Sequence, residues 1–497
     1  FAFDKFVLSP HREAVLVAAA TREAAARAKP ADRGNSIAVL PLANASGDAN
    51  QLFFSDGLSE NLIDALSKLE GLRVIGRTSS FRFRDSKEDA RSIGAKLGVA
   101  YLLAGSVQRA DDQVRIRAEV VRTSDGSAIW TDSFDRPFRD LFALQDELTR
   151  AIAGVLKAKL LSPGARTDDR PPSGSVEAYS AFLRGAFYAD RGEDGDMRRA
   201  IAEMTRATQL DPGYASAWAA LSRNWTTLAA LGLSGDEAQR AYAEARKAGD
   251  VALGLAPDLG DAYVARGWLL ENAELDWRGA TIAYRRGLEL SPDNLQTMFS
   301  MASMLALQGQ LNEAIALSRQ ALDNDPMSPN WWNWYSAYLS AVGRLDEAEA
   351  AIRQSIALRP QGSSAWAQLA IIELQRGDAK AALDAAEKEP EGVWHEIALA
   401  MALQVGKDRA AADAALAKLI ADHGDVAAYQ VAQVQALRND ADATFEWLQR
   451  AHETRDPGVG NTLIDPLVMR YRNDPRLAAF CKTVGLPPPT ESQTKGL

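Results

Sequence analysis

Residues 295–326 read LQTMFSMASMLALQGQLNEAIALSRQALDNDP, and this stretch decides the fold of the larger part of the chain. Small residues recur where two packed helices would touch, with a glycine at the turn between them: Ala302, Gly309, Ala314 and Ala321. Residues 329–360 repeat this order with Ser336, Gly343, Ala348 and Ser355. The pattern predicts helical hairpins that must stack on one another, because one hairpin alone cannot bury its apolar face.

The spacing of the prolines that end such stretches extends this prediction along the chain. The prolines are Pro212, Pro257, Pro292, Pro326 and Pro360, with gaps of 45, 35, 34 and 34 residues. A 34-residue period with a terminal proline is the signature of tetratricopeptide (TPR) repeats. Residues 176–455 therefore resemble the TPR family, with about eight hairpins in an α-solenoid superhelix. We expect residues 456–497 to form a C-terminal cap and tail.

Residues 36–161 have the pattern of a compact α/β unit. SIAVLPL (36–42) is a short apolar run typical of a buried strand, and residues 54–69 have the apolar period of a helix. The alternation in QVRIRAEVV (113–121) predicts a strand with one face in solvent. The predicted order is β-α-β-α-β-β-β-α, a mixed sheet with helices against it. The Pro, Gly and Ser content of SPGARTDDRPPSGS (162–175) indicates a linker.

Three separated segments of this unit carry a further resemblance. They are IAVLPLANASGDANQLFFSDGLSENLIDALSKLEGLRVIGRTSSF, IGAKLGVAYLLAGSVQR and FDRPFRDLFALQDELTRAI. In this order they resemble the TolB-like amino-terminal domain, although Leu42 replaces the usual Phe. That domain is common in bacterial envelope and signalling proteins, often joined to TPR repeats. The resemblance implies an interaction or regulatory module, and a two-domain chain of the α+β and all-α classes.

Composition and motifs argue against several other functions. The net charge of −10 and the pI near 5.2 argue against general nucleic-acid binding, because proteins that bind nucleic acids usually carry an excess of basic residues. The single cysteine, Cys481, excludes an internal disulfide framework and a cysteine-built metal site. The sequence contains no HExxH, GxxxxGK[ST] or GxSxG motif. We therefore expect no catalytic residue, no metal, no cofactor and no small-molecule substrate.

The first residues bear on localisation. The sequence begins with Phe1 rather than Met, and FAFDKFVLSP places Phe1, Phe3 and Phe6 in an apolar tip. We expect residues 1–35 to be a juxtamembrane helix or tether. The resemblance implies an anchor in the inner membrane upstream of Phe1, with the domains on the periplasmic side; a cytoplasmic placement and the start of a surface helix stay open as alternatives.

The TPR resemblance also implies which residues face a ligand. TPR proteins use the second, fifth, ninth, twelfth and thirteenth positions of a repeat, on the helix that lines the concave face. The candidates are Asp261, Val264, Trp268, Glu271, Asn272, Gln296, Phe299, Ser303, Asn330, Asn333, Ser340, Ser364, Ile371 and Gln375. No lysine lies among them, which argues against a carboxylate clamp. A protein or peptide ligand with apolar anchors fits better, with Trp268 and Phe299 as hot spots.

The aromatic run WWNWY (331–335) divides by the same geometry. Its helical phase predicts that Trp332 and Tyr335 pack inside and between hairpins, with Trp331 beside them. Trp334 is expected to border the groove. Asn333 is then the residue of this run that faces a ligand.

One charged segment and one rival function complete the predictions. RTSSFRFR (77–84) carries Arg77, Arg82 and Arg84 on the expected loop after the second strand. These arginines form either an anion or partner patch or a solvated loop paired with the nearby acids Asp85, Glu88 and Asp89. The leading function is a non-enzymatic scaffold of the bacterial envelope. The alternative is the sensory half of a membrane signalling protein, with a winged-helix or nucleotide-cyclase output domain upstream.

Overall fold

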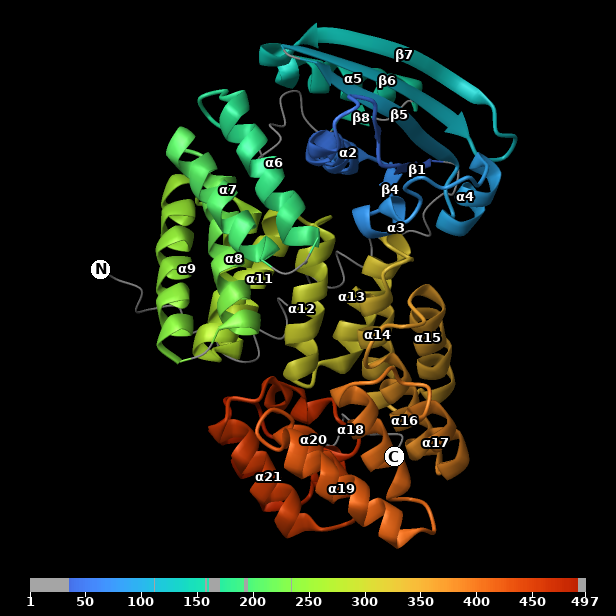
Figure 1. Ribbon diagram of the computed structural model, residues 1–497, viewed down its shortest axis with the longest axis vertical. Coiled ribbons are helices and arrows are strands. Elements are labelled where there is room, and N and C mark those ends of the chain that lie inside the picture. The colour runs from blue at the N-terminus through green and yellow to red at the C-terminus, as the bar shows by residue number, and fades with distance from the viewer. Residues whose placement is uncertain are drawn as a thin grey trace.

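The computed structural model describes residues 35–110, 112–156, 159–160, 170–191, 195–233 and 235–489. An α/β domain precedes a long array of helical hairpins, and a small cap follows the last hairpin (Figure 1). This architecture confirms the predicted fold class. The expected tether (1–35) lies outside the described residues except for Asn35, as does the expected linker up to residue 169.

The α/β domain is built on one mixed sheet. Its strands and helices are β1 (Ser36–Val39), β2 (Ala43–Asn44), η1 (Ala49–Gln51), α2 (Leu52–Ser67), β3 (Leu69–Glu70), β4 (Arg73–Val74), α3 (Arg77–Phe81), α4 (Ala90–Leu97), β5 (Tyr101–Ala110), β6 (Gln113–Arg122), β7 (Ala128–Pro137), η2 (Phe138–Asp140), α5 (Leu141–Val155) and β8 (Lys159–Leu160). The strand order is β4-β1-β5-β6-β7, and β2 also pairs with β5. β1 is parallel to β4 and β5, whereas β5, β6 and β7 are antiparallel. β3 and β8 form a separate antiparallel pair.

Burial in this sheet follows the sequence pattern. All four residues of β1 are buried, as expected for an apolar run between two parallel neighbours. β6 alternates exposed and buried residues along most of its length. α2 and α5 share one apolar core with the sheet, while α4 contributes Ile93 and Leu97 to a second. Residues 77–81 form the short helix α3, so the expectation of a loop there was wrong.

The helical half consists of paired helices joined by short turns. The pairs are α6 (Val176–Arg191) and α7 (Asp196–Leu210); α8 (Ala215–Gly232) and α9 (Gly235–Leu255); α10 (Gly260–Leu269), extended by the π-helical turn η3 (Leu270–Glu274), and α11 (Trp277–Leu290); α12 (Leu295–Leu307) and α13 (Leu311–Asn324); α14 (Pro329–Ala341) and α15 (Leu345–Leu358); α16 (Ala365–Arg376) and α17 (Ala379–Ala386); α18 (Val393–Leu403) and α19 (Arg409–His423); α20 (Ala428–Leu437) and α21 (Ala441–Glu453). We number these pairs hairpins 1 to 8. The cap that follows comprises η4 (Pro457–Leu463), η5 (Val468–Tyr471) and α22 (Pro475–Thr483).

Small residues let the two helices of a hairpin approach closely. A Cβ atom at Gly267 of α10 would lie 2.7 Å from the Tyr284 ring of α11. One at Gly185 of α6 would lie 2.9 Å from Met204 of α7. A larger side chain at either place would force the helices apart, because protein cores are closely packed. The small residues of the repeat therefore set the spacing of the hairpins.

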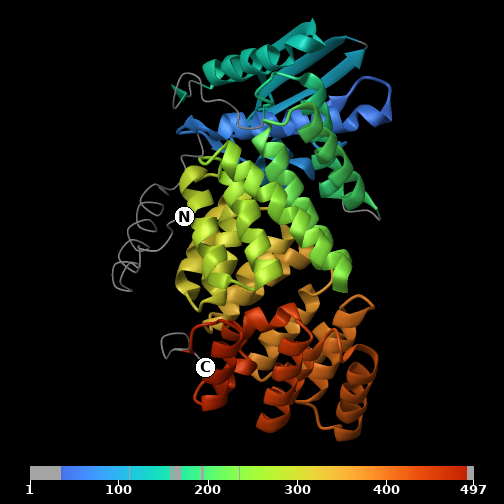
Figure 2. The same ribbon diagram turned by 90° about the vertical axis from the view of Figure 1, so that its left-hand side faces the viewer.

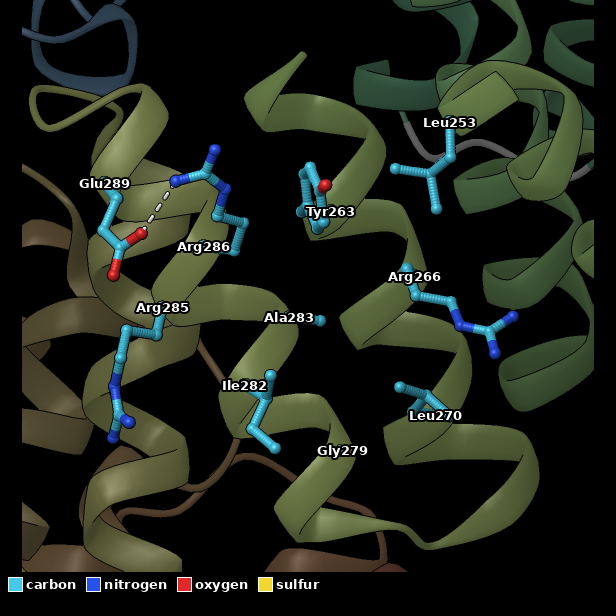
Figure 3. A pocket seen from close by; sticks show the side chains of 10 residues that line it. All are labelled: Leu253, Tyr263, Arg266, Leu270, Gly279, Ile282, Ala283, Arg285, Arg286 and Glu289. Carbon is cyan, nitrogen blue, oxygen red and sulfur yellow. Dashed lines mark hydrogen bonds and ion pairs between the residues drawn. The ribbon is translucent and has the colours of Figure 1, made fainter. Parts of the chain in front are cut away.

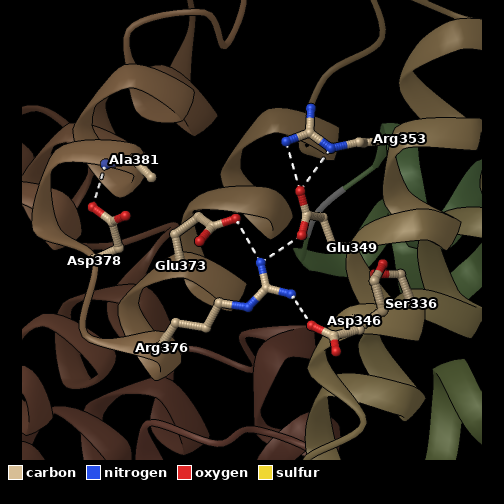
Figure 4. A network of polar contacts seen from close by, with 9 residues as sticks. Ser336, Asp346, Glu349, Arg353, Glu373, Arg376, Asp378 and Ala381 are labelled. Atoms are coloured by element: carbon tan, nitrogen blue, oxygen red, sulfur yellow. Dashed lines mark hydrogen bonds and ion pairs between the residues drawn. The ribbon is translucent and has the colours of Figure 1, made fainter.

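Charged side chains add a bridge between hairpins 5 and 6 (Figure 4). Arg376 of α16 donates to Asp346 at 2.7 Å and to Glu349 at 2.5 Å, both on α15. It also reaches Glu373 of its own helix at 3.2 Å. Arg353 holds Glu349 from the other side at 2.8 Å. The bridge lies near the surface, where ion pairs add little stability individually.

The α/β domain packs against the loop between hairpins 4 and 5. The Gly76 N–H donates to the Asn324 carbonyl at 2.8 Å. The Ser79 N–H donates to Asp325 Oδ1 at 2.7 Å, and the Ser79 hydroxyl donates to the same oxygen. The Met327 N–H donates to Ser79 Oγ at 2.8 Å. We call this contact the polar seam.

The cap packs against hairpins 3 and 4 at the other ends of their helices. Trp277, at the start of α11, is 6% exposed, and its Nε1–H donates to the Val484 carbonyl at 2.8 Å. Gly460 of η4 lies against Leu307 and Trp277. Hairpin 8 holds the cap, since the Tyr429 hydroxyl donates to Asp465 Oδ2 at 2.9 Å. We call this contact the apolar seam; through it the array closes on itself (Figure 2).

Candidate partner-binding surface

The first helices of the hairpins line the inner side of the array. α8 contacts α10, and α14, α16, α18 and α20 contact one another in sequence. Besides the first helix of its own hairpin, each of the second helices α7, α9, α11, α13, α15, α17 and α19 contacts the first helix of the following hairpin. Residues on the free face of the first helices therefore form one inner surface, which is where the predicted ligand positions lie.

Aromatic side chains form the centre of this surface. The rings of Phe299 (α12) and Trp331 (α14) stack at 5.7 Å with an angle of 11° between their planes, and both are half-buried. Trp268 of α10 is also half-buried, and its Nε1–H donates to Thr227 Oγ1 at 3.2 Å. Three successive first helices thus each present an aromatic ring that retains some contact with solvent.

The rest of WWNWY packs against its neighbours. The Trp332 Nε1–H donates to the Pro326 carbonyl at 2.7 Å, and the ring meets Tyr335 edge-on at 6.1 Å. Tyr335 is 7% exposed. Trp334 is half-buried and lies 6.2 Å from Tyr338. The expected packing of Trp332 and Tyr335 is confirmed.

A carboxyl group lies among these rings. Glu271 accepts a hydrogen bond from the Tyr284 hydroxyl at 2.8 Å. Burial raises the pKa of Glu271 to about 7 even though this hydrogen bond favours the ionised form. Burial and the neighbouring Glu271 raise the pKa of Tyr284 well above its ordinary value. The surface therefore holds a carboxyl group that changes charge near neutral pH.

Two amide oxygens on this surface lack a hydrogen-bond partner in the described structure. They are Oδ1 of Asn333 and Oε1 of Gln375, and both atoms are shielded from solvent. The Gln375 amide nitrogen donates to Ser340 Oγ at 2.5 Å, so the amide oxygen is the atom of this side chain that lacks a hydrogen-bond partner in the described structure. A shielded acceptor without a donor costs about 1–3 kcal/mol, which a bound N–H group would recover.

Two predicted ligand positions are buried in the array. Val264 is 4% exposed, and Ser340 is 1% exposed beneath Gln375. Val264 packs towards Gly287 of α11, where the missing side chain leaves room for it. The expectation that these two side chains face a ligand was wrong, because both are used in packing between helices.

The remaining predicted positions are exposed or half-buried, and several are already held by neighbours. Asp261 accepts from Asn294, the Asn272 amide donates to the Trp268 carbonyl, Asn330 accepts from Arg359, and the Ser364 N–H donates to Glu389. Gln296 is exposed, while Ser303 and Ile371 are half-buried.

The predicted arginine patch is engaged by the chain itself. Arg77 pairs with Glu60 and, at 3.1 Å, with Asp190 of α6. Arg84 pairs with Asp56 at 2.7 Å. Arg82 donates to the Leu358 carbonyl at 2.6 Å. Arg77 and Arg82 are therefore part of the contact between the two domains, whereas Arg84 is held within the α/β domain. The expected pairing with nearby acids was also wrong for Arg77 and Arg84, whose partners come from α2 and α6.

Sequence reasoning missed both seams. Ser79 and Asp325 are 246 residues apart, and Trp277 and Val484 are 207 apart. The only signal was the tryptophan at the start of a repeat helix, Trp277, which the family pattern does not require.

Among the described residues, no group of three or more His, Cys, Asp or Glu side chains could hold a metal ion. No helix in that part of the chain is long and apolar enough to cross a membrane.

The repeat geometry confirms the fold of the helical half. Hairpins 4 and 5 begin at Leu295 and Pro329, one 34-residue period apart, and the intervening small residues Ala302, Ala314 and Ala321 are buried at helix contacts. The helical half therefore has the stacked-hairpin fold that the TPR pattern predicts.

Comparison with known proteins gives matches to parts of the chain. Residues 33–151 match the family model for the second domain of HilA/YgeH-like transcriptional regulators. The putative adenylate cyclase 3 of Rhizobium meliloti (strain 1021) is 40% identical over 189 residues, which make up 38% of this chain. The match covers 32% of that relative, so the chain spans about a third of its length.

Solved structures of TPR proteins resemble part of the array. PilW, a type IV pilus biogenesis factor, is 16% identical, with a TM-score of 0.37 over 49% of this chain and 99% of PilW. PilF of Pseudomonas aeruginosa is 17% identical, with a TM-score of 0.34 over 43% of this chain and 97% of PilF. YrrB, a TPR protein with an unusual peptide-binding site, is 17% identical, with a TM-score of 0.30 over 43% of this chain and 96% of YrrB.

Proposed function

We propose that this chain is a non-enzymatic scaffold whose TPR array binds a protein or peptide on its inner surface. The observation that carries the proposal is the row of half-buried rings on hairpins 3, 4 and 5, namely Trp268, Phe299 and Trp331. Aromatic side chains at the centre of a surface are typical binding hot spots. The net charge of −10 supports a protein partner rather than nucleic acid for this region.

The unpaired amide oxygens support an extended peptide as the ligand. Asn333 and Gln375 lie on hairpins 5 and 6, beside the aromatic row. A peptide backbone supplies N–H donors at regular spacing, and such donors would pair with these oxygens once a rotation of the amide side chains brings them to the surface. Apolar side chains of the same peptide would then pack on the exposed parts of Phe299 and Trp331.

The test is partner capture by crosslinking in the native membrane, followed by affinity measurements with the captured protein. The double variant Trp268→Ala/Phe299→Ala is expected to weaken binding at least ~10-fold, which corresponds to about 1.4 kcal/mol. The matched control is Phe445→Ala/Trp447→Ala on α21, a second helix outside the inner surface. Undiminished binding by the folded Trp268/Phe299 variant would rule out this surface as the binding site.

A second candidate function is the regulatory half of a signalling protein with an upstream output domain. The comparisons favour it, because one match is to a domain of transcriptional regulators and the other to a putative adenylate cyclase. In this form the TPR array would sense a partner and the α/β domain would transmit the signal. The check is cyclic AMP formation, and separately DNA binding, by the full-length natural protein with and without the crosslinked partner. If the full-length protein has neither activity, the signalling function is excluded and the scaffold function is the one that stands.

We also propose that the chain is held at the inner membrane with these domains on the periplasmic side. The support is the aromatic tip at Phe1, Phe3 and Phe6 and the resemblance to TolB-like envelope proteins. Fractionation of the full-length protein, combined with protease digestion after the outer membrane is opened, tests the placement. Recovery in the soluble fraction, or protection from the protease, would exclude it in favour of the cytoplasm.

A further inference from the structure

A second surface feature lies on hairpin 3, where residues of α10 and α11 line an open hollow (Figure 3). The hollow has a volume of about 500 Å³, and Leu253 of α9 also lines it. Tyr263, Leu270 and Ala283 give it an apolar lining. At its edge Ile282 is 56% exposed, an unusual degree of exposure for a large apolar side chain in this structure.

A comparison with the cavity at the equivalent position of hairpin 5 shows which side chains make the hollow of hairpin 3 larger. There the cavity is about 290 Å³. The fourth and seventh residues of α14 are Trp332 and Tyr335, whose rings occupy the space between the helices. The same positions of α10 are Tyr263 and Arg266. Arg266 extends towards Asp250, 3.6 Å away, and so leaves the space open.

The charge of the two places also differs. Arg266, Arg285 and Arg286 are among the residues that line the hollow of hairpin 3. Arg286 lies 3.0 Å from Glu289, the one carboxylate in the lining, and Arg266 lies 3.6 Å from Asp250 outside it. The second helix of hairpin 3 presents Ile282 and Arg286. In hairpin 5, the residues in the same register are Ala350 and Gln354. An apolar hollow with arginines in its lining thus distinguishes hairpin 3 from hairpin 5, in a chain of net charge −10.

We propose that this hollow is a docking site for an acidic, amphipathic segment of a partner protein. An apolar side chain of the segment packs between Tyr263 and Ile282, and its carboxylates pair with Arg285 and Arg286. Charge complementarity selects the occupant, because an acidic segment offsets the excess of guanidinium groups while its apolar face covers Ile282. The site is separate from the inner surface and does not depend on the function proposed for it.

The test uses labelled helical peptides and fluorescence anisotropy with the whole chain. The first probe carries Leu on one face and Glu on the other; two matched probes replace Glu by Lys, or Leu by Ser. We expect the acidic Leu probe to bind in the micromolar range and the other two to bind at least ~10-fold more weakly. Arg285→Gln/Arg286→Gln and Ile282→Ser should each weaken binding of the acidic Leu probe about 10-fold or more.

The controls are Gln354→Glu and Ala350→Ser, the equivalent changes on hairpin 5, which should leave binding unchanged. Circular dichroism checks that each variant is folded. The proposal is overturned if the acidic Leu probe does not bind, if the Ser-substituted probe binds equally well, or if the hairpin 5 variants weaken it as much. Tighter binding to phosphatidylglycerol vesicles than to the peptide, lost in the Ile282 variant, would assign the hollow to a lipid surface and also overturn it.

Discussion

The α/β domain and the cap close opposite ends of the TPR hairpins with different chemistry. At the polar seam, backbone N–H groups and the Ser79 hydroxyl meet Asp325 and the neighbouring carbonyls. At the apolar seam, the Trp277 ring is enclosed by the cap, and one hydrogen bond to Val484 fixes its orientation. The first seam depends on donors, acceptors and charge, whereas the second depends on buried apolar area.

This difference indicates distinct roles for the two contacts. Burial of a large aromatic ring is strong, insensitive to pH and not directional. A seam made of hydrogen bonds and ion pairs fixes a relative orientation and responds to protonation. We therefore expect the apolar seam to hold the array closed, and the polar seam to set the position of the α/β domain.

The largest expected effect comes from breaking the apolar seam. Trp277→Ala should lower the free energy of unfolding by about 3–5 kcal/mol, because it leaves a large cavity. The buried Cys481, the single cysteine, reports on the cap, since burial raises the pKa of its thiol to about 11 and slows alkylation. The variant should react much faster with iodoacetamide. Trp366→Ala, which removes a half-buried ring elsewhere, is the control; equal rates in both variants would show that Trp277 does not hold the cap.

A smaller effect is expected at the polar seam. Ser79→Ala removes one donor from the buried Asp325 and the acceptor of the Met327 N–H, at a cost of about 1–3 kcal/mol. Hydrogen exchange should become faster at residues 324–327 and stay unchanged in the cap. Ser363→Ala, at an exposed site, controls for the substitution itself. Equal protection of 324–327 in the wild type and in the variant would contradict the assignment.

The ion pairs of Arg77, which join α2 to α6 beside the polar seam, should depend on pH. Partial burial and the neighbouring Asp190, Asp64 and Asp56 raise the pKa of Glu60 from 4.5 to about 8, despite its pairing with Arg77. The folded chain therefore binds this proton more tightly than the unfolded chain. Its contribution to stability is fully present below about pH 4.5 and is lost as the pH rises through about 8.

The free energy of unfolding can be measured by urea unfolding at a series of pH values. Glu60→Gln should reduce its dependence on pH between about 4.5 and 8. Glu70→Gln, at an exposed position outside the seam, should leave the slope as it is. Cys481 alkylation, compared between variants at each pH, should not change with Glu60→Gln. An unaltered slope in the Glu60 variant would show that another group titrates there.

The smallest effect is expected from the ion-pair bridge between hairpins 5 and 6, which belongs to neither seam. Arg376→Gln should cost at most ~1 kcal/mol, because the bridge lies near the surface. The difference from the wild type should shrink in about 1 M salt, where charges are screened within about 3 Å. A larger or salt-independent loss would indicate that the bridge sets the stacking of these hairpins.

Local patterns predicted the elements of both domains well. The apolar run at 36–42 and the alternation at 113–121 depend only on whether each side chain faces the core or solvent. β1 and β6 show the burial that these patterns predict. The 34-residue period likewise reflects contacts between neighbouring hairpins. The same reasoning was wrong for Val264 and Ser340, because a family position gives an average direction while the local side chains decide the packing.

The sequence by itself therefore determined the mixed sheet, the stacked hairpins and the packing of Trp332 and Tyr335, since each follows from neighbours within one repeat or one strand pair. Only the tertiary structure decided that Arg77 and Arg82 serve the contact between domains, and that the cap returns to Trp277. Those contacts join residues more than a hundred positions apart. A sequence repeat cannot predict such long-range contacts, because they depend on the curvature that the whole array of hairpins adds up to.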